Sequence, residues 1–320
     1  FKRLPLLNKD IILSQGTNLY SNDHHNRHSF KNSSGGSTGK PVIIMQDKSY
    51  LDANLAGRFW YNEWGGKFIG EPEIKFWGSE RDALVGKDNI KTRLNRWLFN
   101  TNLLNTYCMS DKDFFSYVTQ WNQIKPTLVW AYTDSIYKFS QFLEKHQIKL
   151  FKPKSIICTT SPLLPEMREY IEKTIGCPVL NQYGSREVGC VAADCLKQEG
   201  LHVLPLHNFV EILDEDNQPV PPGVQGKVVI TNLNNFSMPL IRYDIGDTAY
   251  FSDNKCSCGR QFPILGNITG RKFSHFKKRD GALVHSQFFV ALMFYRSWVK
   301  AFRITQIDYD KIDHGENDGV

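Results

Sequence analysis

The sequence of 320 residues has no long apolar run, no signal-like N-terminus and no concentrated charge. No apolar stretch approaches the roughly 18 residues of a membrane-spanning helix, and no secretory signal pattern opens the chain. Lysines and arginines number 39 against 33 aspartates and glutamates, but the densest basic run, at 277–279, has three residues. These absences argue against a membrane span and a nucleic-acid partner, and they leave small anionic ligands open.

Cysteine is present without the features of a disulfide-rich secreted protein. The chain has seven cysteines and no secretion signal, which favours thiols or metal ligands in a reducing compartment. We therefore expect a cytoplasmic protein. A hydrophobic content of 41%, with 13% aromatic residues, predicts a globular chain of one large or two ordinary domains.

Alternating apolar runs and helical periodicity predict an α/β fold with a parallel sheet. In the clearest unit, a strand at 155–158 is followed by a helix with Ser161 as N-cap and Pro162 in its first turn. Gly176 closes this helix, and the next strand lies at 179–181. A strand–helix–strand unit of this length is typical of parallel sheets.

Other regions give weaker signals. After Leu201 the pattern changes to short strands separated by turns, which predicts a smaller β-rich subdomain at about 201–270. The polar residues 21–34 predict a loop. Residues 93–105 mix turn signals with helical periodicity.

The most distinctive stretch is 32–41, which contains three glycines, four hydroxyl side chains and one lysine. Glycines bring backbone N–H groups close to an oxyanion, and hydroxyls add donors. The P-loop pattern fails because Ser34 replaces its first glycine and Pro41 follows Lys40 where a hydroxyl residue is required. We expect a flexible loop between two strands that closes over a polyphosphate, with a Gly/Ser linker as the alternative.

Three further motifs carry candidate chemistry. Tyr183 could stack on a purine, Gly184 allows a close approach, and Glu187 could hold magnesium on phosphates. Asp247, expected at the end of an apolar strand, suits the hydroxyls of a ribose, and Arg271 suits a phosphate or a ribose. Taken singly, each has an ordinary alternative as a turn or a surface residue.

In this order and spacing the motifs resemble the adenylate-forming superfamily of acyl-CoA synthetases. The segments at 239–243 and 256–260 resemble its phenylacetate–CoA ligase branch, which includes coenzyme F390 synthetase and the CapK proteins of polysaccharide gene clusters. The resemblance runs from about Leu4 to Tyr309. It implies a large adenylation core at 1–270, and at 271–320 a hinge and the start of a truncated C-terminal domain that is mostly absent.

The resemblance also implies residue roles. The β- and γ-phosphates of ATP would be held by Ser34, Gly36, Ser37, Thr38, Gly39 and Lys40. Tyr183, Gly184 and Ser185 would line the adenine and acyl-adenylate site, with Glu187 on Mg²⁺, Asp247 on the ribose and Arg271 on the nucleotide. Lys40, Glu187 and Arg271 would be catalytic.

The implied activity is ATP-dependent activation of a carboxylic acid as an acyl-adenylate, followed by transfer to coenzyme A or to another thiol or amine. The setting implied is surface polysaccharide biosynthesis, and a homodimer is compatible with the sequence. One alternative is an acyl-protein synthetase that passes a fatty acyl group to a protein cysteine. The other is a degenerate nucleotide-binding protein without turnover.

Three positions depart from the family pattern. Arg186 replaces the common threonine before the magnesium glutamate, Val42 stands where many members have a second lysine, and Ser274 takes the hinge aspartate position. Ser274 puts the second half-reaction in question and favours the degenerate binder. Lys40, Glu187 and Asp247 favour an enzyme, because binding alone does not require a magnesium carboxylate beside the phosphates.

The cysteines suggest a separate metal site. Cys256 and Cys258, together with Cys195 and His202, make a candidate Cys₃His set for structural zinc. Cys190 is the substitute if Cys195 is not a ligand. Because buried thiols are common, an ordinary core role is the alternative.

Overall fold

The computed structural model describes residues 1–33, 42–78, 90–106, 109–266, 268, 275–279, 283–285, 303–309 and 311–315. The chain divides into two compact units, one of Phe1–Ile245 with Ala249–Ile268 and the other of Gly246–Thr248 with Thr269–Val320. The predicted boundaries at about 201 and 270 stay predictions. No helix in the part of the chain that the structure describes is long and apolar enough to cross a membrane.

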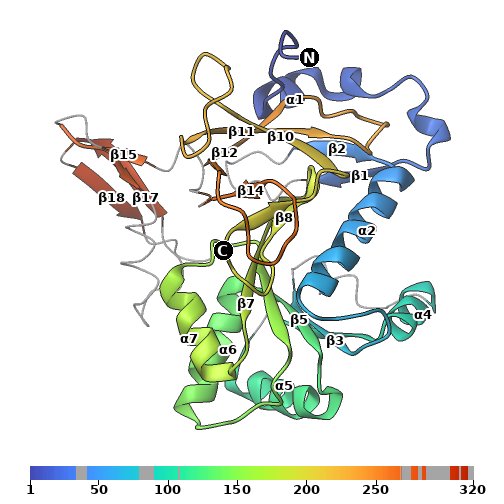
Figure 1. Cartoon of the computed structure of the whole chain (residues 1–320), viewed down its shortest axis with the longest axis vertical. Helices are drawn as coiled ribbons and strands as arrows, with labels where there is room; N and C mark the ends of the chain where they lie inside the picture. Colours follow the sequence, from blue (N-terminus) through green and yellow to red (C-terminus); the bar gives the residue numbers. More distant parts are fainter. Residues whose placement is uncertain are drawn as a thin grey trace. The chain divides into compact units, whose positions relative to one another are not determined.

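A mixed nine-stranded sheet organises the first unit, which confirms the α/β prediction (Figure 1). Its strands run in the spatial order β13-β14-β9-β8-β7-β6-β5-β3-β4. The parallel part consists of β3 (Glu73–Trp77), β4 (Thr101–Asn105), β5 (Leu128–Tyr132), β6 (Ser155–Thr159) and β7 (Val179–Ser185). The antiparallel part consists of β8 (Gly189–Ala193), β9 (Leu201–Val203), β13 (Phe251–Ser252) and β14 (Ile264–Leu265).

Helices cover this sheet as the apolar periodicity predicts. Three of them, α5 (Asp111–Ile124), α6 (Thr133–Lys145) and α7 (Pro165–Ile175), pack in sequence order beside the parallel strands (Figure 1). The long helix α2 (Lys48–Trp64) contacts β8, and its Asn62 accepts a 2.7 Å hydrogen bond from the indole of Trp130 on β5. The helix α4 (Ile90–Leu98) lies at the outer edge, next to β4.

The helix after β6 begins later than predicted. Leu164 is the N-cap of α7 and Pro165 its first residue, so the expected start at Ser161 is wrong. The hydroxyl of Ser161 instead donates a 2.7 Å hydrogen bond to Asp134 at the start of α6. The predicted end is confirmed, because Gly176 caps the helix in the left-handed conformation at φ +83°.

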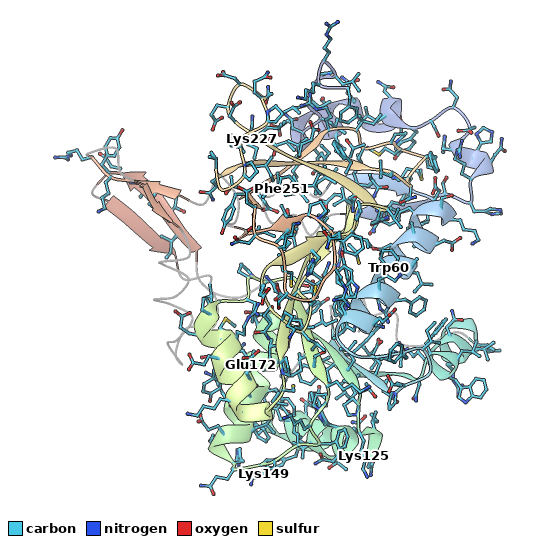
Figure 2. The ribbon with its side chains drawn as sticks, viewed as in Figure 1. Trp60, Lys125, Lys149, Glu172, Lys227 and Phe251 are labelled. Carbon is cyan, nitrogen blue, oxygen red and sulfur yellow. The ribbon has the colours of Figure 1, made fainter. Side chains whose placement is uncertain are left out.

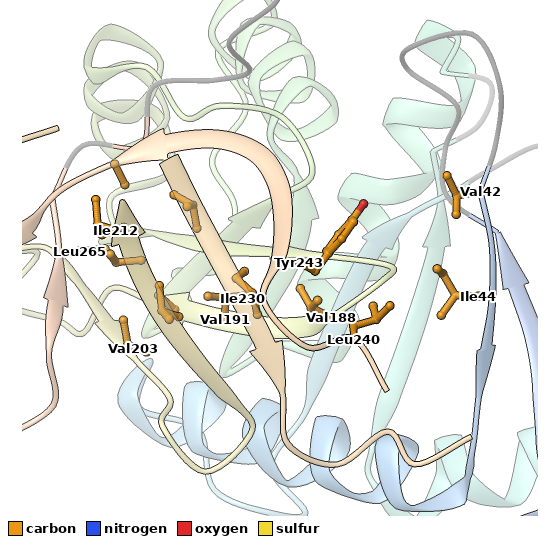
Figure 3. Close-up of a cluster of buried hydrophobic side chains, with 14 of the residues drawn as sticks. Val42, Ile44, Val188, Val191, Val203, Ile212, Ile230, Leu240, Tyr243 and Leu265 are labelled. Carbon is orange, nitrogen blue, oxygen red and sulfur yellow. The ribbon is translucent and has the colours of Figure 1, made fainter. Parts of the chain in front are cut away.

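The β-rich region divides between two sheets. Strands β10 (Asn208–Leu213), β11 (Gly226–Asn232) and β12 (Tyr243–Ala249) form a three-stranded sheet, whereas β9, β13 and β14 continue the large sheet. A buried cluster joins residues of both sheets to Val42 and Ile44, as Figure 3 shows. Ile44 belongs to β2 (Ile43–Gln46), which pairs antiparallel with β1 (Phe30–Ser33).

The N-terminal segment is more ordered than its polarity suggests. The helix α1 (Lys9–Gln15) leads into two short 3₁₀ helices, at Gly16–Leu19 and His24–Asn26, and then into β1. The expectation of a loop throughout 21–34 is therefore wrong for 24–26 and 30–33. In the second unit the described residues form two hairpins, β15 (His275–Lys277) with β16 (Leu283–His285) and β17 (Arg303–Asp308) with β18 (Lys311–Gly315).

Candidate functional site

The Tyr-Gly-Ser-Arg-Glu motif lies where the large sheet changes from parallel to antiparallel. Tyr183, Gly184 and Ser185 are the last residues of β7, and Glu187 lies in the turn that leads to β8. The motif is thus at the C-terminal edge of the parallel strands, the usual position of ligand sites in such sheets. The first three residues of the motif are part of β7, and only Arg186 and Glu187 lie in the turn after it.

Side chains from distant parts of the sequence hold this turn. Gln46 donates hydrogen bonds of 2.8 Å to the Arg186 carbonyl and 3.3 Å to the Glu187 carbonyl, and Tyr50 donates one of 3.2 Å to the Arg186 carbonyl. The Ser185 hydroxyl accepts from the Glu187 N–H at 3.2 Å. The turn backbone is therefore fixed by hydrogen bonds before any ligand binds.

Close packing requires glycine at both ends of the turn. A Cβ on Gly184 would lie 2.3 Å from the Gly189 carbonyl oxygen. At Gly189, where φ is +70°, it would lie 2.6 Å from Asn54 Oδ1 and 2.7 Å from His207 Nε2. Asn54 also accepts a 2.9 Å hydrogen bond from the Cys190 N–H, so α2 braces the start of β8.

The surroundings of the Glu187 carboxylate are compatible with a bound cation. Its side chain belongs to a residue only 8% exposed. Within the described ranges, no lysine or arginine forms an ion pair with it. Because an opposite charge within a few ångströms favours the ionised form of a carboxyl group, a bound cation would be stabilised here. This donor set fits a hard ion such as Mg²⁺.

The flanks of the glycine-rich stretch reach this turn. Arg186, exposed, donates a 3.3 Å hydrogen bond to the carbonyl of Ser33 at the end of β1. Residues 34–41 connect β1 to β2, as predicted, but they lie outside the described residues. This holds for Ser34, Gly36, Ser37, Thr38, Gly39 and Lys40, and also for Arg271 and Ser274. Val42 is fully buried in the hydrophobic core, so apolar packing explains the residue at this departure from the family pattern.

Asp247 lies elsewhere than its sequence pattern predicts. It is an inner residue of β12, not the end of an apolar strand, and it follows Gly246 at φ +85°. The segment Gly246–Thr248 belongs to the second unit. The proposed ribose role therefore stays a prediction.

Several residues at the site make contacts that the sequence does not indicate. Asp47 caps α2 by accepting from the Tyr50 N–H, and its other oxygen accepts from the N–H groups of Phe236 and Ser237, both at 2.9 Å. At the ends of β6 and β7, the Thr159 hydroxyl donates to Gln182 at 2.6 Å. An N-cap aspartate before a helix is readable from sequence. Its partners almost two hundred residues later are not.

Four predicted metal ligands come together in the first unit. The candidate ligand atoms of Cys195, His202, Cys256 and Cys258 all lie within 4.8 Å of one another. Cys195 Sγ is 3.6 Å from Cys256 Sγ, and Cys258 Sγ is 3.5 Å from His202 Nε2. Cys190, the substitute, is not in this group.

Two of these groups, His202 and Cys258, have pKa shifts that suit a metal ligand, whereas burial raises the pKa of Cys256 to about 12. Burial, with the nearby Arg260 guanidinium, lowers the pKa of His202, which keeps the imidazole neutral as a ligand must be. Burial raises the pKa of Cys258, but hydrogen bonds from the backbone and side chain of Arg260 outweigh it, and the net pKa is lowered. A lowered thiol pKa favours the metal-binding thiolate.

Aromatic rings enclose this group on one side. Trp64 contacts the His202 ring at 5.6 Å between centroids, and the Arg260 guanidinium lies 5.2 Å from the Trp64 ring centre. Phe262 packs against both Trp64 and Trp60, which Figure 2 labels on α2. Three of the four ligands are buried and Cys258 is partly exposed, so the group lies at the border of the core.

Comparison with known proteins finds similar sequences and structures. No family model matches the chain. Protein CapK of Staphylococcus aureus is 24% identical over 316 residues, which make up 97% of this chain and 68% of CapK. A phenylacetate–coenzyme A ligase of Thermus thermophilus is 32% identical over 114 residues, 34% of this chain and 26% of the ligase.

The fold agrees with these relatives. The crystal structure of 2-hydroxyisobutyryl-CoA ligase in the postadenylation state, in complex with R3-HIB-AMP, matches with a TM-score of 0.73 at 17% identity. The match covers 94% of this chain and 65% of that one, so the chain spans about two thirds of the length of this ligase and of CapK. Together these similarities confirm the resemblance to the adenylate-forming superfamily and to its phenylacetate–CoA ligase branch, and the solved structure shows that the fold is shared.

Proposed function

We propose that this chain activates a carboxylic acid with ATP and magnesium. The observation that carries the proposal is Glu187, a residue 8% exposed whose carboxylate has no cationic partner among the described residues, on a turn at the C-terminal edge of the parallel strands. A turn held by Gln46 and Tyr50 positions this carboxylate without reorganisation, which is how electrostatic catalysis lowers a barrier.

The proposed reaction has two steps. The acid's carboxylate oxygen attacks the α-phosphorus of ATP, forming an acyl-adenylate while the bond to the bridging oxygen breaks and pyrophosphate leaves. A thiol, in the simplest case that of coenzyme A, then attacks the acyl carbon, loses its proton and displaces AMP. Positioning and charge neutralisation supply most of the catalysis in phosphoryl chemistry of this kind.

Residue roles follow from this proposal. Lys40 and the hydroxyls and glycines of 34–39 would hold the β- and γ-phosphates, and Asp247 and Arg271 would hold the ribose and nucleotide. Tyr183, Gly184 and Ser185 would line the adenylate. Magnesium, held by Glu187, would neutralise phosphate charge. A cytoplasmic location and a role in surface polysaccharide synthesis stay predictions.

The fate of the acyl group separates the alternatives. An acyl-protein synthetase would make the same adenylate and pass it to a protein cysteine. A degenerate binder would bind ATP without releasing pyrophosphate, and it has no evident use for an unpaired carboxylate at position 187.

We also infer that Cys195, His202, Cys256 and Cys258 hold one structural zinc ion. The fit rests on four soft ligand atoms already within 4.8 Å of one another. A further support is that they join β9 to the segment 256–258, which precedes β14 in the same sheet. A closed tetrahedral ion would stabilise this edge and take no part in the reaction.

Pyrophosphate release from ATP tests the main proposal. We would assay the purified chain with Mg²⁺ and a panel of aryl, fatty, sugar and amino acids, and in parallel measure ATP binding. We expect release with one class of acid, and a loss of roughly 10²-fold in Glu187→Gln, as when a transition-state charge partner is removed. The exposed Glu169→Gln on α7 is the matched control and should keep full activity.

The outcomes separate the hypotheses. Undiminished release by Glu187→Gln would remove this residue from the mechanism. ATP binding without release across the panel would favour the degenerate binder. Transfer of the product to a protein cysteine, and not to coenzyme A, would favour the acyl-protein synthetase.

A further inference from the structure

The helix α4 exposes a continuous apolar stripe. Ile90 is 85% exposed, Trp97 is 76% exposed, and Leu94 and Leu98 are each 52% exposed. Their spacing of four, seven and eight residues places them on one side of the helix, within an arc of about 100°. Exposure of four large apolar side chains on one face of a nine-residue helix needs a physical explanation.

The apolar surface continues beyond the helix. Asn100, just after α4, donates a 3.1 Å hydrogen bond to the carbonyl of Gly70. This bond brings the end of α4 against the loop that carries Phe68 and Ile69, which are 61% and 68% exposed. Phe99 packs against Phe59 of α2 at 5.3 Å between ring centroids, so the helix is anchored at its C-terminal end. We call the six residues Ile90, Leu94, Trp97, Leu98, Phe68 and Ile69 the α4 face.

Positive charge borders this stripe. The helix contains Lys91, Arg93 and Arg96 and no acidic residue. By helical register, Arg93 takes a position about 40° from one edge of the stripe. A tryptophan and aliphatic residues bordered by positive charge, on a helix of low overall hydrophobicity, are the features of helices that lie in the surface of a membrane.

We propose that the α4 face docks on an anionic lipid surface. Ile90, Leu94 and Trp97 would enter the boundary between headgroups and acyl chains, while the flanking cations stay at the level of lipid phosphates. The helix α4 lies at the outer edge of the first unit (Figure 1). The helix carries arginines and no acidic residue, and this charge complements an anionic surface.

Vesicle flotation tests this proposal independently of any enzymatic activity. The purified chain would be mixed with vesicles of phosphatidylcholine alone, or of phosphatidylcholine with 30% phosphatidylglycerol, at low and at physiological salt. We expect flotation with the anionic vesicles only, weakened by salt. Arg93→Gln should lower the partition coefficient roughly fivefold, since each cation near such a surface contributes about that factor.

Apolar variants and a matched control complete the experiment. Leu94→Gln with Trp97→Gln should abolish flotation and leave the thermal unfolding midpoint unchanged, because both side chains are largely exposed. Leu206→Gln, at a leucine 68% exposed outside the α4 face, should float as the parent does. Absence of flotation by the parent, or unchanged flotation by the double variant, would overturn the proposal. So would a parent dimer in sedimentation velocity that the double variant converts to monomer.

Discussion

The two regions at opposite ends of β8 differ in the contacts that stabilise them. The turn at 185–189 precedes β8, and Cys195 follows β8 by two residues. The turn is held by hydrogen bonds from Gln46, Tyr50 and Ser185. The Cys₃His group has contacts of 3.5 and 3.6 Å between weak sulfur partners, and the buried Nδ1 of His202 has no partner among the described residues.

The difference indicates which region depends on a ligand for its stability. Hydrogen bonds of normal length satisfy the turn, so its geometry exists without a nucleotide. A group of buried thiols and an imidazole contributes little by itself, and it gains most when a metal replaces its weak contacts. We therefore expect ligand removal to destabilise the Cys₃His end of β8 much more than the turn.

The largest expected effect is the loss of zinc. Elemental analysis should find about one zinc per chain, and removal by a strong chelator should lower the free energy of unfolding by about 4 kcal/mol, the linkage value for an ion present at a thousand times its dissociation constant. Urea unfolding with and without chelator measures this change. Cys256→Ser should reproduce the loss and no longer respond to chelator.

Cys190→Ser is the matched control for this experiment. Cys190 lies on β8 between the two regions and outside the ligand group. This variant should keep its zinc and its full response to chelator. If the purified protein contains no zinc and chelator does not change its stability, the four residues have an ordinary role in the core.

The turn should respond to a steric change instead. Gly184→Ala places a Cβ 2.3 Å from the Gly189 carbonyl oxygen, so the backbone must shift. We expect a loss of about 3 kcal/mol in urea unfolding, typical of overpacking, together with loss of pyrophosphate release. Gly223→Ala is the comparison: its Cβ meets nothing within 4 Å, and its φ of +79° should cost only about 1 kcal/mol. Equal effects at the two glycines would contradict the close packing of the turn.

Sequence patterns predicted the elements that depend on local periodicity. The buried strands β6 and β7 and the helix α7 between them have apolar spacing that matches their burial. The Cys₃His group could also be assembled from sequence, because cysteine and histidine are few and their metal chemistry is specific. The functional motifs were interpreted together through their resemblance to a family, because no single motif specifies a function.

Elements fixed by distant partners could not be predicted. The strand β4, with the sequence Thr-Asn-Leu-Leu-Asn, is an edge strand whose polar residues hide its pairing with β3. Ser161 has the side chain of an N-cap, but its hydroxyl bonds Asp134 and its carbonyl accepts from Thr133 at 2.9 Å. Gln46 donates to carbonyls 140 and 141 residues away. In each case a tertiary contact outweighs the local preference.

The smallest effect concerns the pH response of the turn. Burial lowers the pKa of His207, although its hydrogen bond with Asn234 opposes this. The unfolded chain then binds this proton more readily, so the contribution of His207 to stability is present above the ordinary histidine pKa of about 6.5 and is lost as the pH falls below it. We expect urea unfolding to weaken by about 1 kcal/mol per pH unit below that value. His207→Gln should reduce this slope and leave the part that comes from His202, whose pKa is also lowered by burial. The same change at His25, on the 3₁₀ helix His24–Asn26, should leave the slope unaltered. Because His207 Nε2 faces Gly189, an unaltered slope in His207→Gln would mean that the buried imidazole does not sense acid at this end of the turn.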